Sequence, residues 1–312
     1  MRILVTGGAG FIGSHVAATL LAAGHEVAIV DNLSTGHPWN VPAGAALYEC
    51  DIRDERLAQV FTDFKPEVVS HHAAQMSVRV SLQQPRLDAA VNVEGSAHLL
   101  ECARATGTRK VIYASTGGAA YGEPRYLPCD EEHPVAPLSQ YGISKHTVEH
   151  YLELYAGLYD LDYTVLRYPN VFGPRQDPEG EAGVVAIFAR RMLRNLPITI
   201  YGDGLQERDF VYVGDVARAT ALALTSGSRA LVNLGSGQGT SVRAIFDLLA
   251  DDIGYTQPPH YAPARLGEVY RIYLSGDRAR AVLGWAPEVT LADGLRETVR
   301  WVRTQDAVAA PA

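Results

Sequence analysis

The chain has 312 residues, of which 47% are hydrophobic, 20% are charged and 8% are aromatic. This composition is typical of a globular protein and excludes a disordered or fibrous chain, which would be poorer in apolar residues. The net charge of -8 offers no basic surface to nucleic acid or to an anionic membrane. No apolar run reaches the roughly 18 residues of a membrane span. We therefore expect neither a nucleic-acid partner nor a membrane.

Three cysteines, Cys50, Cys102 and Cys129, are spread along the chain without a close pair. Their odd number and wide spacing argue against a disulfide framework or a zinc site. The adjacent histidines His71 and His72 have no further ligands at metal-binding spacing, so we expect them to pack at the end of a strand. The sequence thus predicts a reducing, cytoplasmic location and no bound metal.

Short apolar runs alternate with longer amphipathic segments through the first half of the chain. In chain order, we predict a strand at 2–6, a helix at 11–23, strands at 26–31, 46–51 and 67–71, a helix at 92–106, a strand at 110–115, a helix at 140–158 and a strand at 163–167. Continuous apolar runs are typical of strands buried on both faces of a parallel sheet. Their alternation with helices predicts βαβ units with helices on both faces of that sheet.

The pattern changes after residue 170. We predict a loop at 170–183, a helix at 184–195, a short strand at 198–201, two strands at 210–213 and 231–234 that rejoin the main sheet, helices at 242–252 and 291–303, and a frayed tail after residue 303. The length of the chain permits two such units. We expect a larger domain of residues 1–169 plus about 207–237, and a smaller α+β lobe of about 170–206 plus 238–312.

A glycine-rich segment directly follows the first strand and opens the first helix. Gly7, Gly10 and Gly13 permit a tight turn, close approach to a pyrophosphate and anion binding at the helix N-terminus. Asp31 ends the second strand about 18 residues later, near the usual spacing of about 20. A carboxylate at this position accepts hydrogen bonds from the ribose hydroxyls and repels a 2′-phosphate. This context predicts a Rossmann-type doubly wound parallel sheet that prefers NAD to NADP. The alternative is a glycine-rich turn that binds no ligand.

Tyr141 and Lys145 are four residues apart on a predicted helix and therefore share one face. Tyrosine has a pKa of about 10 and is a poor base at neutral pH. A nearby ammonium group, together with the positive nicotinamide of an oxidised cofactor, favours the phenolate. The pair therefore predicts a catalytic base, and the alternative is a packed tyrosine beside a surface lysine.

A hydroxyl-rich turn, Ser115-Thr116-Gly117-Gly118, follows the fifth strand. Ligands of open α/β sheets bind at the carboxyl ends of the strands. A hydroxyl at Thr116 can bond a substrate oxygen there and share its proton with a tyrosine. By itself the segment is also compatible with an ordinary turn.

The segment Thr6-Gly7-Gly8-Ala9-Gly10-Phe11-Ile12-Gly13-Ser14, Asp31 and the set Thr116, Tyr141 and Lys145 together resemble the extended short-chain dehydrogenase/reductase family. The resemblance extends to about Trp301 and is closest to members that interconvert UDP-glucose and UDP-galactose with NAD. It implies that Thr116, Tyr141 and Lys145 are catalytic. The cofactor-binding residues that it implies are Gly7, Gly10, Phe11, Ile12, Gly13, Asp31, Asn32, Asp51, Ile52, His72, Ala73, Ala74, Gln75, Asn92, Ser115, Tyr141, Lys145 and Tyr168. The substrate-binding residues that it implies are Thr116, Gly117, Tyr141, Asn170, Val184, Tyr201, Arg208, Arg265 and Glu268.

The same resemblance implies a mechanism. Tyr141 removes the proton of the sugar 4-hydroxyl, Thr116 relays or aligns that proton, and Lys145 binds the nicotinamide ribose and lowers the pKa of Tyr141. NAD takes hydride from C4 and returns it to the other face of the 4-keto sugar after rotation, while the C-terminal lobe holds the UDP. The helices at 92–106 and 140–158 would form the four-helix interface of a homodimer.

Some positions depart from the family pattern. Thr116 replaces the usual serine, Gly117-Gly118 lengthens the turn by about one residue, and Glu268 replaces aspartate. Ile272 stands where the family controls access of N-acetylated sugars, so UDP-N-acetylhexosamine stays open as a substrate, as does UDP-glucuronate. A dehydratase is disfavoured because Gly117-Gly118 occupies the place of its Asp-Glu pair. A keto-sugar reductase and a non-catalytic NAD sensor are the remaining alternatives.

Overall fold

The structure is a computed structural model, which describes residues 1–178, 183–264 and 269–309. Its central element is a seven-stranded sheet in the order β11-β6-β5-β4-β1-β2-β3, and every neighbouring pair in it is parallel. These strands are β1 (Arg2–Thr6), β2 (Glu26–Asp31), β3 (Ala46–Glu49), β4 (Val68–His71), β5 (Lys110–Thr116), β6 (Asp162–Tyr168) and β11 (Ala230–Asn233). The predicted Rossmann-type parallel sheet is thus confirmed.

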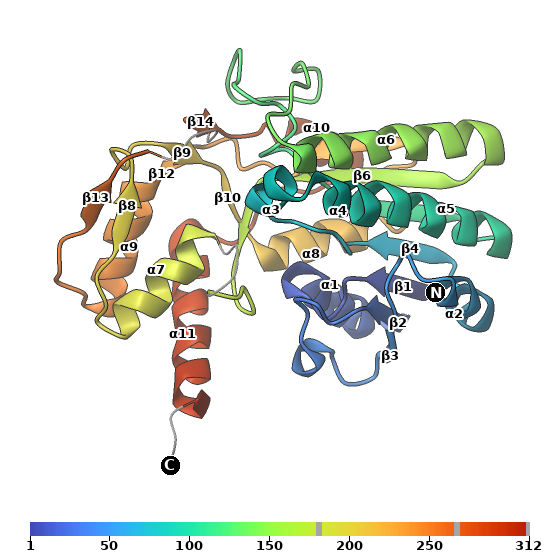
Figure 1. The fold of residues 1–312 in the computed structure, drawn as a ribbon, viewed down its shortest axis with the longest axis horizontal. Coiled ribbons are helices and arrows are strands. Elements are labelled where there is room, and N and C mark those ends of the chain that lie inside the picture. Colours follow the sequence, from blue (N-terminus) through green and yellow to red (C-terminus); the bar gives the residue numbers. More distant parts are fainter. Residues whose placement is uncertain (179–182, 265–268, 310–312) are drawn as a thin grey trace.

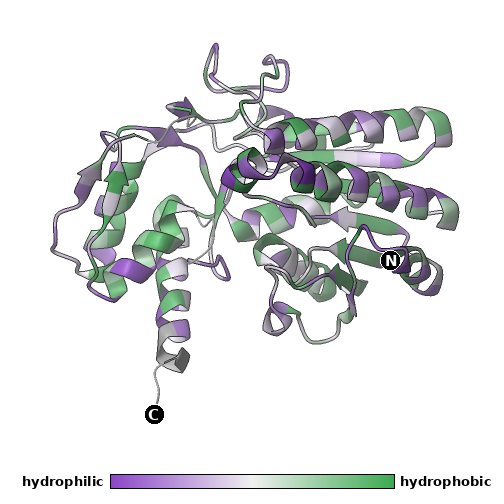
Figure 2. Cartoon of the chain, viewed as in Figure 1, coloured by the Kyte–Doolittle hydropathy of each residue, from purple (hydrophilic) through white to green (hydrophobic). Residues whose placement is uncertain are grey.

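Helices cover both faces of the sheet (Figure 1). One face is packed by α1 (Phe11–Ala22), α8 (Val213–Leu222) and α10 (Asp277–Leu283). The other is packed by α2 (Arg56–Phe64), α5 (Gly95–Thr106) and α6 (Gln140–Tyr159). Burial on both faces explains why these strands are continuous apolar runs, and Figure 2 shows hydrophobic colour concentrated along the inner strands.

Three helical segments precede α5. They are α3 (Val78–Gln83), α4 (Pro85–Ala89) and a π-helical turn, η2 (Ala90–Glu94), and a further short helix, η1 (Pro38–Asn40), follows β2. The sequence prediction missed α2, α3, α4, α8 and α10, and it included part of η2 in the helix that contains α5. A π-turn is rare and often marks a functional site, and this one contains Asn92, a predicted cofactor residue.

A smaller lobe has its own apolar core. It contains α7 (Val184–Leu193), β8 (Thr199–Tyr201), β9 (Glu207–Arg208), β12 (Thr240–Ser241), α9 (Val242–Ile253), β13 (His260–Ala262), β14 (Arg271–Ile272) and α11 (Leu291–Ala309). Its core joins α7, α9 and α11 through apolar side chains such as Phe188, Phe246 and Val299. Short strands and helices around one core make this lobe α+β, as predicted. Within the described ranges no helix has the length and apolarity needed to cross a membrane.

Two sequence predictions about the second half of the chain are wrong. The strand predicted at 210–213 does not rejoin the main sheet: β10 (Phe210–Tyr212) pairs in parallel with β7 (Asn170–Phe172), inside the segment predicted as a loop. Only β11 joins the main sheet, because it takes the edge beside β6. We predict a tail that frays after residue 303, whereas the structure describes α11 as helical as far as Ala309.

Candidate active site

The glycine turn between β1 and α1 is too tight for side chains. Gly7 has a φ of +67°, and a Cβ atom there would lie 2.7 Å from the amide nitrogen of Ala73. A Cβ atom on Gly13 would lie 2.2 Å from the carbonyl oxygen of Gly7. The first turn of α1, with Phe11 and Ile12, is thereby pressed against the carboxyl end of β1. Its amides lack helical partners and form a cradle suited to a pyrophosphate.

Asp31 is buried at the end of β2 and is fixed beside this turn. Its Oδ2 accepts a hydrogen bond from the amide of Ala9 at 2.9 Å, and its Oδ1 accepts one from the amide of Leu33 at 2.8 Å. A Cβ atom on Gly36 would lie 2.8 Å from Oδ1, so the chain after β2 folds closely over the carboxylate. The predicted ribose-binding carboxylate therefore lies next to the predicted pyrophosphate cradle.

Asn32, Asp51 and Ile52 meet at the neighbouring strand ends. Asn32 Nδ2 donates to Asp51 Oδ2 at 2.8 Å, and Arg53 donates to both oxygens of the same carboxylate. These hydrogen bonds, chiefly those from Arg53, hold the pKa of Asp51 well below its usual value. Ile52 is buried against Gly95: a Cβ atom on Gly95 would lie 2.7 Å from Cδ1 of Ile52. The structure thus brings together three of the predicted cofactor-binding residues.

Residues 72–75 pass over the carboxyl ends of β1 and β4. Asn92 locks this segment, because its Oδ1 accepts from the amide of Gln75 at 2.8 Å and its Nδ2 donates to the carbonyl of Gln75 at 2.9 Å. Ala73 contacts the glycine turn, and Ala74 links it to Gln75. His72 lies with its ring 6.3 Å from that of Tyr168, and its buried Nδ1 has no hydrogen-bond partner among the described residues. Burial lowers the pKa of His72 to about 3, so the ring is neutral.

Three features at the carboxyl edge of the sheet are suited to a dinucleotide. A cradle that a Cβ atom would fill, a fixed carboxylate at the end of the next strand and an orphaned buried nitrogen on His72 lie along one edge of the sheet. This edge is the carboxyl end of the parallel strands, where open α/β sheets bind nucleotides. The predicted cofactor residues therefore fit NAD.

The start of α6 places Tyr141 beside Thr116. Ser139 begins the helix, since its Oγ accepts from the amide of Gly142 at 3.2 Å. A Cβ atom on Gly142 would lie 2.5 Å from the carbonyl oxygen of Ala119, so the helix packs directly on the turn after β5. Thr116 lies near enough to the phenol of Tyr141 to lower its pKa, against the effect of burial. The longer turn therefore leaves the Thr116 hydroxyl within reach of the tyrosine.

The turn after β5 also approaches Asn170. The amide of Gly117 donates to the carbonyl of Tyr168 at 2.8 Å. A Cβ atom on Gly118 would lie 3.9 Å from Asn170 Oδ1 and 4.0 Å from Thr116 Oγ1. Thr116, Gly118 and Asn170 therefore face one small space next to Tyr141. Ser115 points elsewhere, because its hydroxyl donates to Glu149 Oε1 at 2.6 Å.

Lys145 is buried one helical turn after Tyr141. Its Nζ lies 4.7 Å from the centre of the Tyr113 ring, a cation–π contact. Burial lowers the pKa of Lys145 to about 8, against the opposing effects of the carboxylates of Asp88 and Glu149. The predicted surface lysine of the alternative interpretation is therefore excluded.

The pKa of Tyr141 differs from the sequence prediction, which expected Lys145 to lower it. The pKa of Tyr141 is raised to about 12, first by burial and then by the Asp88 carboxylate, against the opposing effect of Thr116. Loss of hydration penalises the phenolate more than the protein around it compensates. The positive nicotinamide, which the prediction also invoked, belongs to the cofactor and not to the chain.

A buried polar group that the sequence analysis missed lies behind this pair. Asp88 is fully buried in α4 and accepts hydrogen bonds from Gln75, Asn92 and Ser144. A signal was present in the sequence, since Asp88 stands between apolar neighbours and four residues before Asn92, on the same helical face. Such a buried charge must be hydrogen-bonded or paired.

The predicted substrate residues divide between the two parts of the molecule. Val184 begins α7, and Arg208 lies in β9, where its Nη1 donates to the carbonyls of Glu207 and Tyr270 at 2.9 and 3.2 Å. Tyr201 lines a pocket whose other lining residues are Gly202, Asp203, Gln206, Ala264, Val269 and Tyr270. Arg265 and Glu268 lie outside the described residues, although Ala264 and Val269, which flank them, line this pocket.

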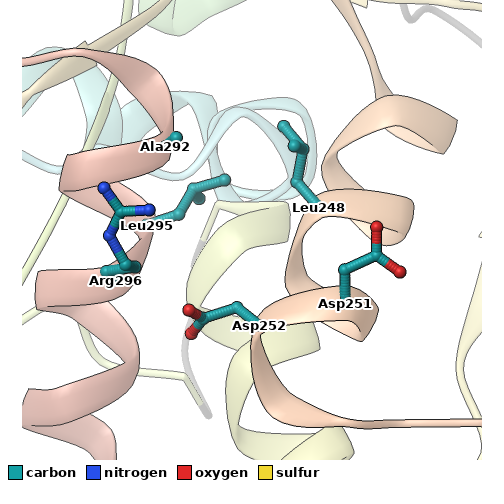
Figure 3. Close-up of a pocket in the computed structure, with 6 residues that line it drawn as sticks. All are labelled: Leu248, Asp251, Asp252, Ala292, Leu295 and Arg296. Atoms are coloured by element: carbon teal, nitrogen blue, oxygen red, sulfur yellow. The ribbon is translucent and has the colours of Figure 1, made fainter.

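A second pocket lies between α9 and α11 (Figure 3). In that view Asp252 extends from α9 and Arg296 from α11 toward the space between the helices. The remaining lining residues are Leu248, Asp251, Ala292 and Leu295. None of them is a predicted site residue, so we do not assign this pocket to the site. Among the described residues there is no group of three or more potential metal ligands.

The model of the family described as "NAD dependent epimerase/dehydratase family" matches residues 3–235. The chain belongs to this family. Among curated relatives, a UDP-glucose 4-epimerase from Mycolicibacterium smegmatis is 44% identical over 311 residues, which cover 98% of this chain and 99% of the relative.

Solved structures agree with the family assignment. The UDP-glucose 4-epimerase of Thermotoga maritima, solved with UDP-glucose, is 49% identical with a TM-score of 0.96, over 98% of this chain and 99% of that one. The UDP-glucose 4-epimerase of Thermus thermophilus, solved as a complex with NAD, is 49% identical with a TM-score of 0.92, over 97% and 99%. Similarity over nearly the full chains includes the smaller lobe, which lies largely beyond the segment that the family model matches.

Proposed function

We propose that this protein interconverts UDP-glucose and UDP-galactose by oxidation at C4, rotation of the 4-keto sugar and re-reduction, with NAD as its resident cofactor. The observation that carries the proposal is that the first turn of α6, with Tyr141, packs directly on the turn after β5 that carries Thr116, at the carboxyl edge of the sheet beside the glycine cradle. Buried Lys145 lies one helical turn further along α6. NAD, when bound, supplies the acceptor and later the donor of the C4 hydride.

Tyr141 acts as the base that removes the proton of the sugar 4-hydroxyl. Its phenol is protonated in the protein alone because burial raises its pKa to about 12, so it must first release this proton to solvent. The hydroxyl of Thr116 and the buried positive charge of Lys145 stabilise the resulting phenolate, which then accepts the proton of the 4-hydroxyl. In the second half of the reaction Tyr141 returns the proton to the 4-oxygen.

The dinucleotide is held by the residues gathered at the carboxyl edge of the sheet. The amides of the turn from Gly7 to Gly13 bind the pyrophosphate, and Asp31 accepts the hydroxyls of the adenine ribose, which favours NAD over NADP. Asn92 supports the cofactor indirectly as well, since it fixes the segment that ends at Gln75. Lys145 binds the nicotinamide ribose, and Tyr168 with His72 borders the nicotinamide.

The smaller lobe, about 170–206 plus 238–312 together with β9 and without α10, binds the nucleotide part of the sugar substrate. Residues 1–169 and the rest of the segment of about 207–237 bind NAD. The pocket lined by Tyr201 has the aromatic and polar groups that suit a nucleoside. Arg208 lies beside it in β9 and can pair with a diphosphate. Arg265 and Glu268 are assigned to the same task from the sequence. Anchoring through UDP leaves the hexose free to turn between its two faces.

The protein functions as a cytoplasmic homodimer in galactose metabolism. Helices α5 and α6 pack side by side, and α6 leaves Ile143, Leu154 and Leu158 exposed by 53%, 53% and 61%. An apolar stripe of this kind is typical of a covered surface. The three cysteines are free and buried, in keeping with a reducing compartment.

Proton NMR of the purified protein with UDP-galactose, and without added cofactor, tests the proposal. We expect the anomeric signal of UDP-glucose to grow until both epimers coexist, with no net change of absorbance at 340 nm. Net consumption or formation of NADH would favour a reductase or a dehydrogenase. If UDP-galactose is inert even with added NAD, the proposed substrate is wrong, and UDP-N-acetylhexosamines and UDP-glucuronate are the next substrates to measure.

A further inference from the structure

Asp88 is a buried carboxylate, and the side chains that donate hydrogen bonds to it are uncharged. It is fully buried in α4. Gln75 Nε2 and Asn92 Nδ2 donate to its Oδ1 at 2.9 and 3.0 Å, and the hydroxyl of Ser144 donates to its Oδ2 at 2.6 Å. Among the described residues it forms no ion pair. These bonds join α4, the π-turn, the segment after β4 and α6 at one point.

Two carboxylates, Asp88 and Glu149, act on Lys145 through their charge, and only Asp88 lacks a charged partner among the described residues. Glu149 is bound by Arg167 through two hydrogen bonds of 2.9 and 2.6 Å, and His146 and Ser115 also contact it. Its charge is therefore largely balanced by the guanidinium. Asp88 has no such partner, and Ser144, the residue that holds its Oδ2, is the neighbour of Lys145 in the chain.

We propose that Asp88 is a positioning residue, which serves as the fixed counter-charge of Lys145 and ties the first turns of α6 to the segment that carries Gln75. Its role in turnover rests on the proposed function, but its effect on Lys145 does not. The carboxylate acts through Lys145 and Tyr141 and is not itself assigned to the substrate or the cofactor.

The other groups around Lys145 do not replace this charge. Tyr113 of β5 presents its ring to the ammonium, and its hydroxyl stays protonated because burial raises its pKa. His71 of β4 and His72, which follows that strand, are neutral, since burial lowers their pKa values. From α6 itself, Tyr141 is protonated and Glu149 is paired with Arg167. Asp88 and Glu149 both favour the charged form of the lysine, and among the described residues Asp88 is the one of the two without a cationic partner.

The same charge opposes ionisation of Tyr141, because two negative charges repel. Removing it is expected to ease loss of the proton from both Tyr141 and Lys145. Both limbs of the pH profile of turnover would then move to lower pH. A residue that only supported the fold would lower the rate at every pH without moving either limb.

The chain contains only three lysines, Lys65, Lys110 and Lys145, so NMR of lysine labelled with ¹³C at Cε reports on Lys145 directly. In the substrate-free wild-type protein we expect a midpoint near 8 for Lys145. Asp88→Asn keeps the size of the side chain and removes its charge, and we expect it to lower this midpoint by about one pH unit. Lys65 and Lys110 are internal controls and should not move. An unchanged Lys145 midpoint would overturn the proposal.

Ser144→Ala is the matched control, because it removes one hydrogen bond and keeps the carboxylate. We expect Ser144→Ala to leave the titration midpoint of Lys145 at its wild-type value. A fall as large as that in D88N would show that the hydrogen-bonded arrangement, and not the charge of Asp88, sets the midpoint. If D88N does not fold, the wild-type carboxyl resonance of Asp88, labelled with ¹³C, must inflect where Lys145 titrates. A flat response there would overturn the proposal as well.

The activity arm separates this inference from the proposed function. If wild-type protein epimerises UDP-galactose, D88N should show both limbs of its pH profile displaced to lower pH. If wild-type protein has no epimerase activity, the proposed function fails, and the lysine titration alone still decides the role of Asp88.

Discussion

Tyr141 must lose a proton that its surroundings, in the protein alone, make it keep. Burial and the carboxylate of Asp88 raise its pKa to about 12, while Thr116 lowers it. Lys145 is buried nearby but has its own pKa lowered to about 8 by burial. The reaction therefore depends on charge that arrives with the cofactor and on a small set of oriented groups.

Replacing Tyr141 by phenylalanine removes the base and leaves the ring. We expect kcat for UDP-galactose to fall by about 100- to 10,000-fold, with the affinity for UDP, measured by calorimetry, within a few-fold of wild type. Retention of wild-type turnover in Y141F would rule out Tyr141 as the base. Loss of UDP affinity to the same degree would point to a structural defect in place of a chemical one.

Two substitutions at Thr116 separate the role of its hydroxyl from the role of its branched shape. Thr116→Val keeps the branched shape and removes the hydroxyl, so we expect a fall in kcat of about tenfold or more, since the phenolate loses a hydrogen-bond donor. Thr116→Ser is the matched control and should keep most of the turnover, measured by NMR of the anomeric signals. Equal activity of the valine and serine variants would remove Thr116 from the mechanism.

At the scale of elements, the glycine turn fixes how closely α1 approaches the end of β1. A methyl group on Gly13 would lie 2.2 Å from the carbonyl of Gly7, so Gly13→Ala should displace the helix and abolish retention of NAD through purification. The measurement is the NAD released from denatured protein. Gly157→Ala in α6 is the control, because nothing lies within 4 Å of its Cβ position, and it should retain NAD in full. Wild-type NAD content in G13A would contradict this role for the turn.

Asp209 joins three segments where the chain passes between the lobes. It accepts hydrogen bonds from Ser236 and from the amide of Leu274, and its carbonyl accepts from the amide of Asn170. Burial raises the pKa of Asp209 to about 6. Because the folded pKa lies above the unfolded one, its contribution to stability is fully present below about pH 4 and is lost as the pH rises through about 6.

We therefore expect the free energy of unfolding of wild type to fall, relative to that of Asp209→Asn, by up to about 3 kcal/mol between pH 4 and 7. Urea denaturation of both proteins across this range measures the difference. Parallel pH dependence of the two proteins would show that Asp209 does not titrate in this window.

The long helices and strands could be predicted from the sequence, whereas the short ones could not. Long apolar runs and helical spacing correctly placed the strands of the main sheet and the helices α1 and α6, because burial on both faces leaves a strong pattern. The strand β10 has only three residues, Phe210–Tyr212, and its sequence does not say whether its partner is β7 or the edge of the main sheet. The short helices α3 and α4 carry too few residues to show a period.

The candidate site also contains some features that the sequence predicts and others that it does not. The four-residue spacing of Tyr141 and Lys145 follows from helical geometry, and the structure brings Thr116 to the pair as predicted. The pKa of Tyr141 could not be predicted, because it depends on burial and on Asp88, which reaches the site from a helix that the sequence did not reveal. Arg265 and Glu268 remain predictions.

At the scale of the whole molecule, the exposed apolar stripe on α6 is the expected dimer contact. Leu158 is 61% exposed there, and Leu158→Glu would place a charge in the interface. We expect light scattering to give a dimer for wild type and a monomer for L158E. Leu196→Glu, at a residue 41% exposed after α7, is the control and should stay dimeric. A monomeric wild-type protein would exclude the proposed interface.

The removal and return of hydride at C4 unites the cradle, the tyrosine and the anchored substrate. The most direct test uses UDP-galactose that carries deuterium at C4, incubated with the purified protein without added reductant. We expect UDP-glucose that retains the deuterium at C4, seen by NMR and mass spectrometry, because the same hydride leaves and comes back. Product with ordinary hydrogen at C4, or no product, would contradict the proposed reaction.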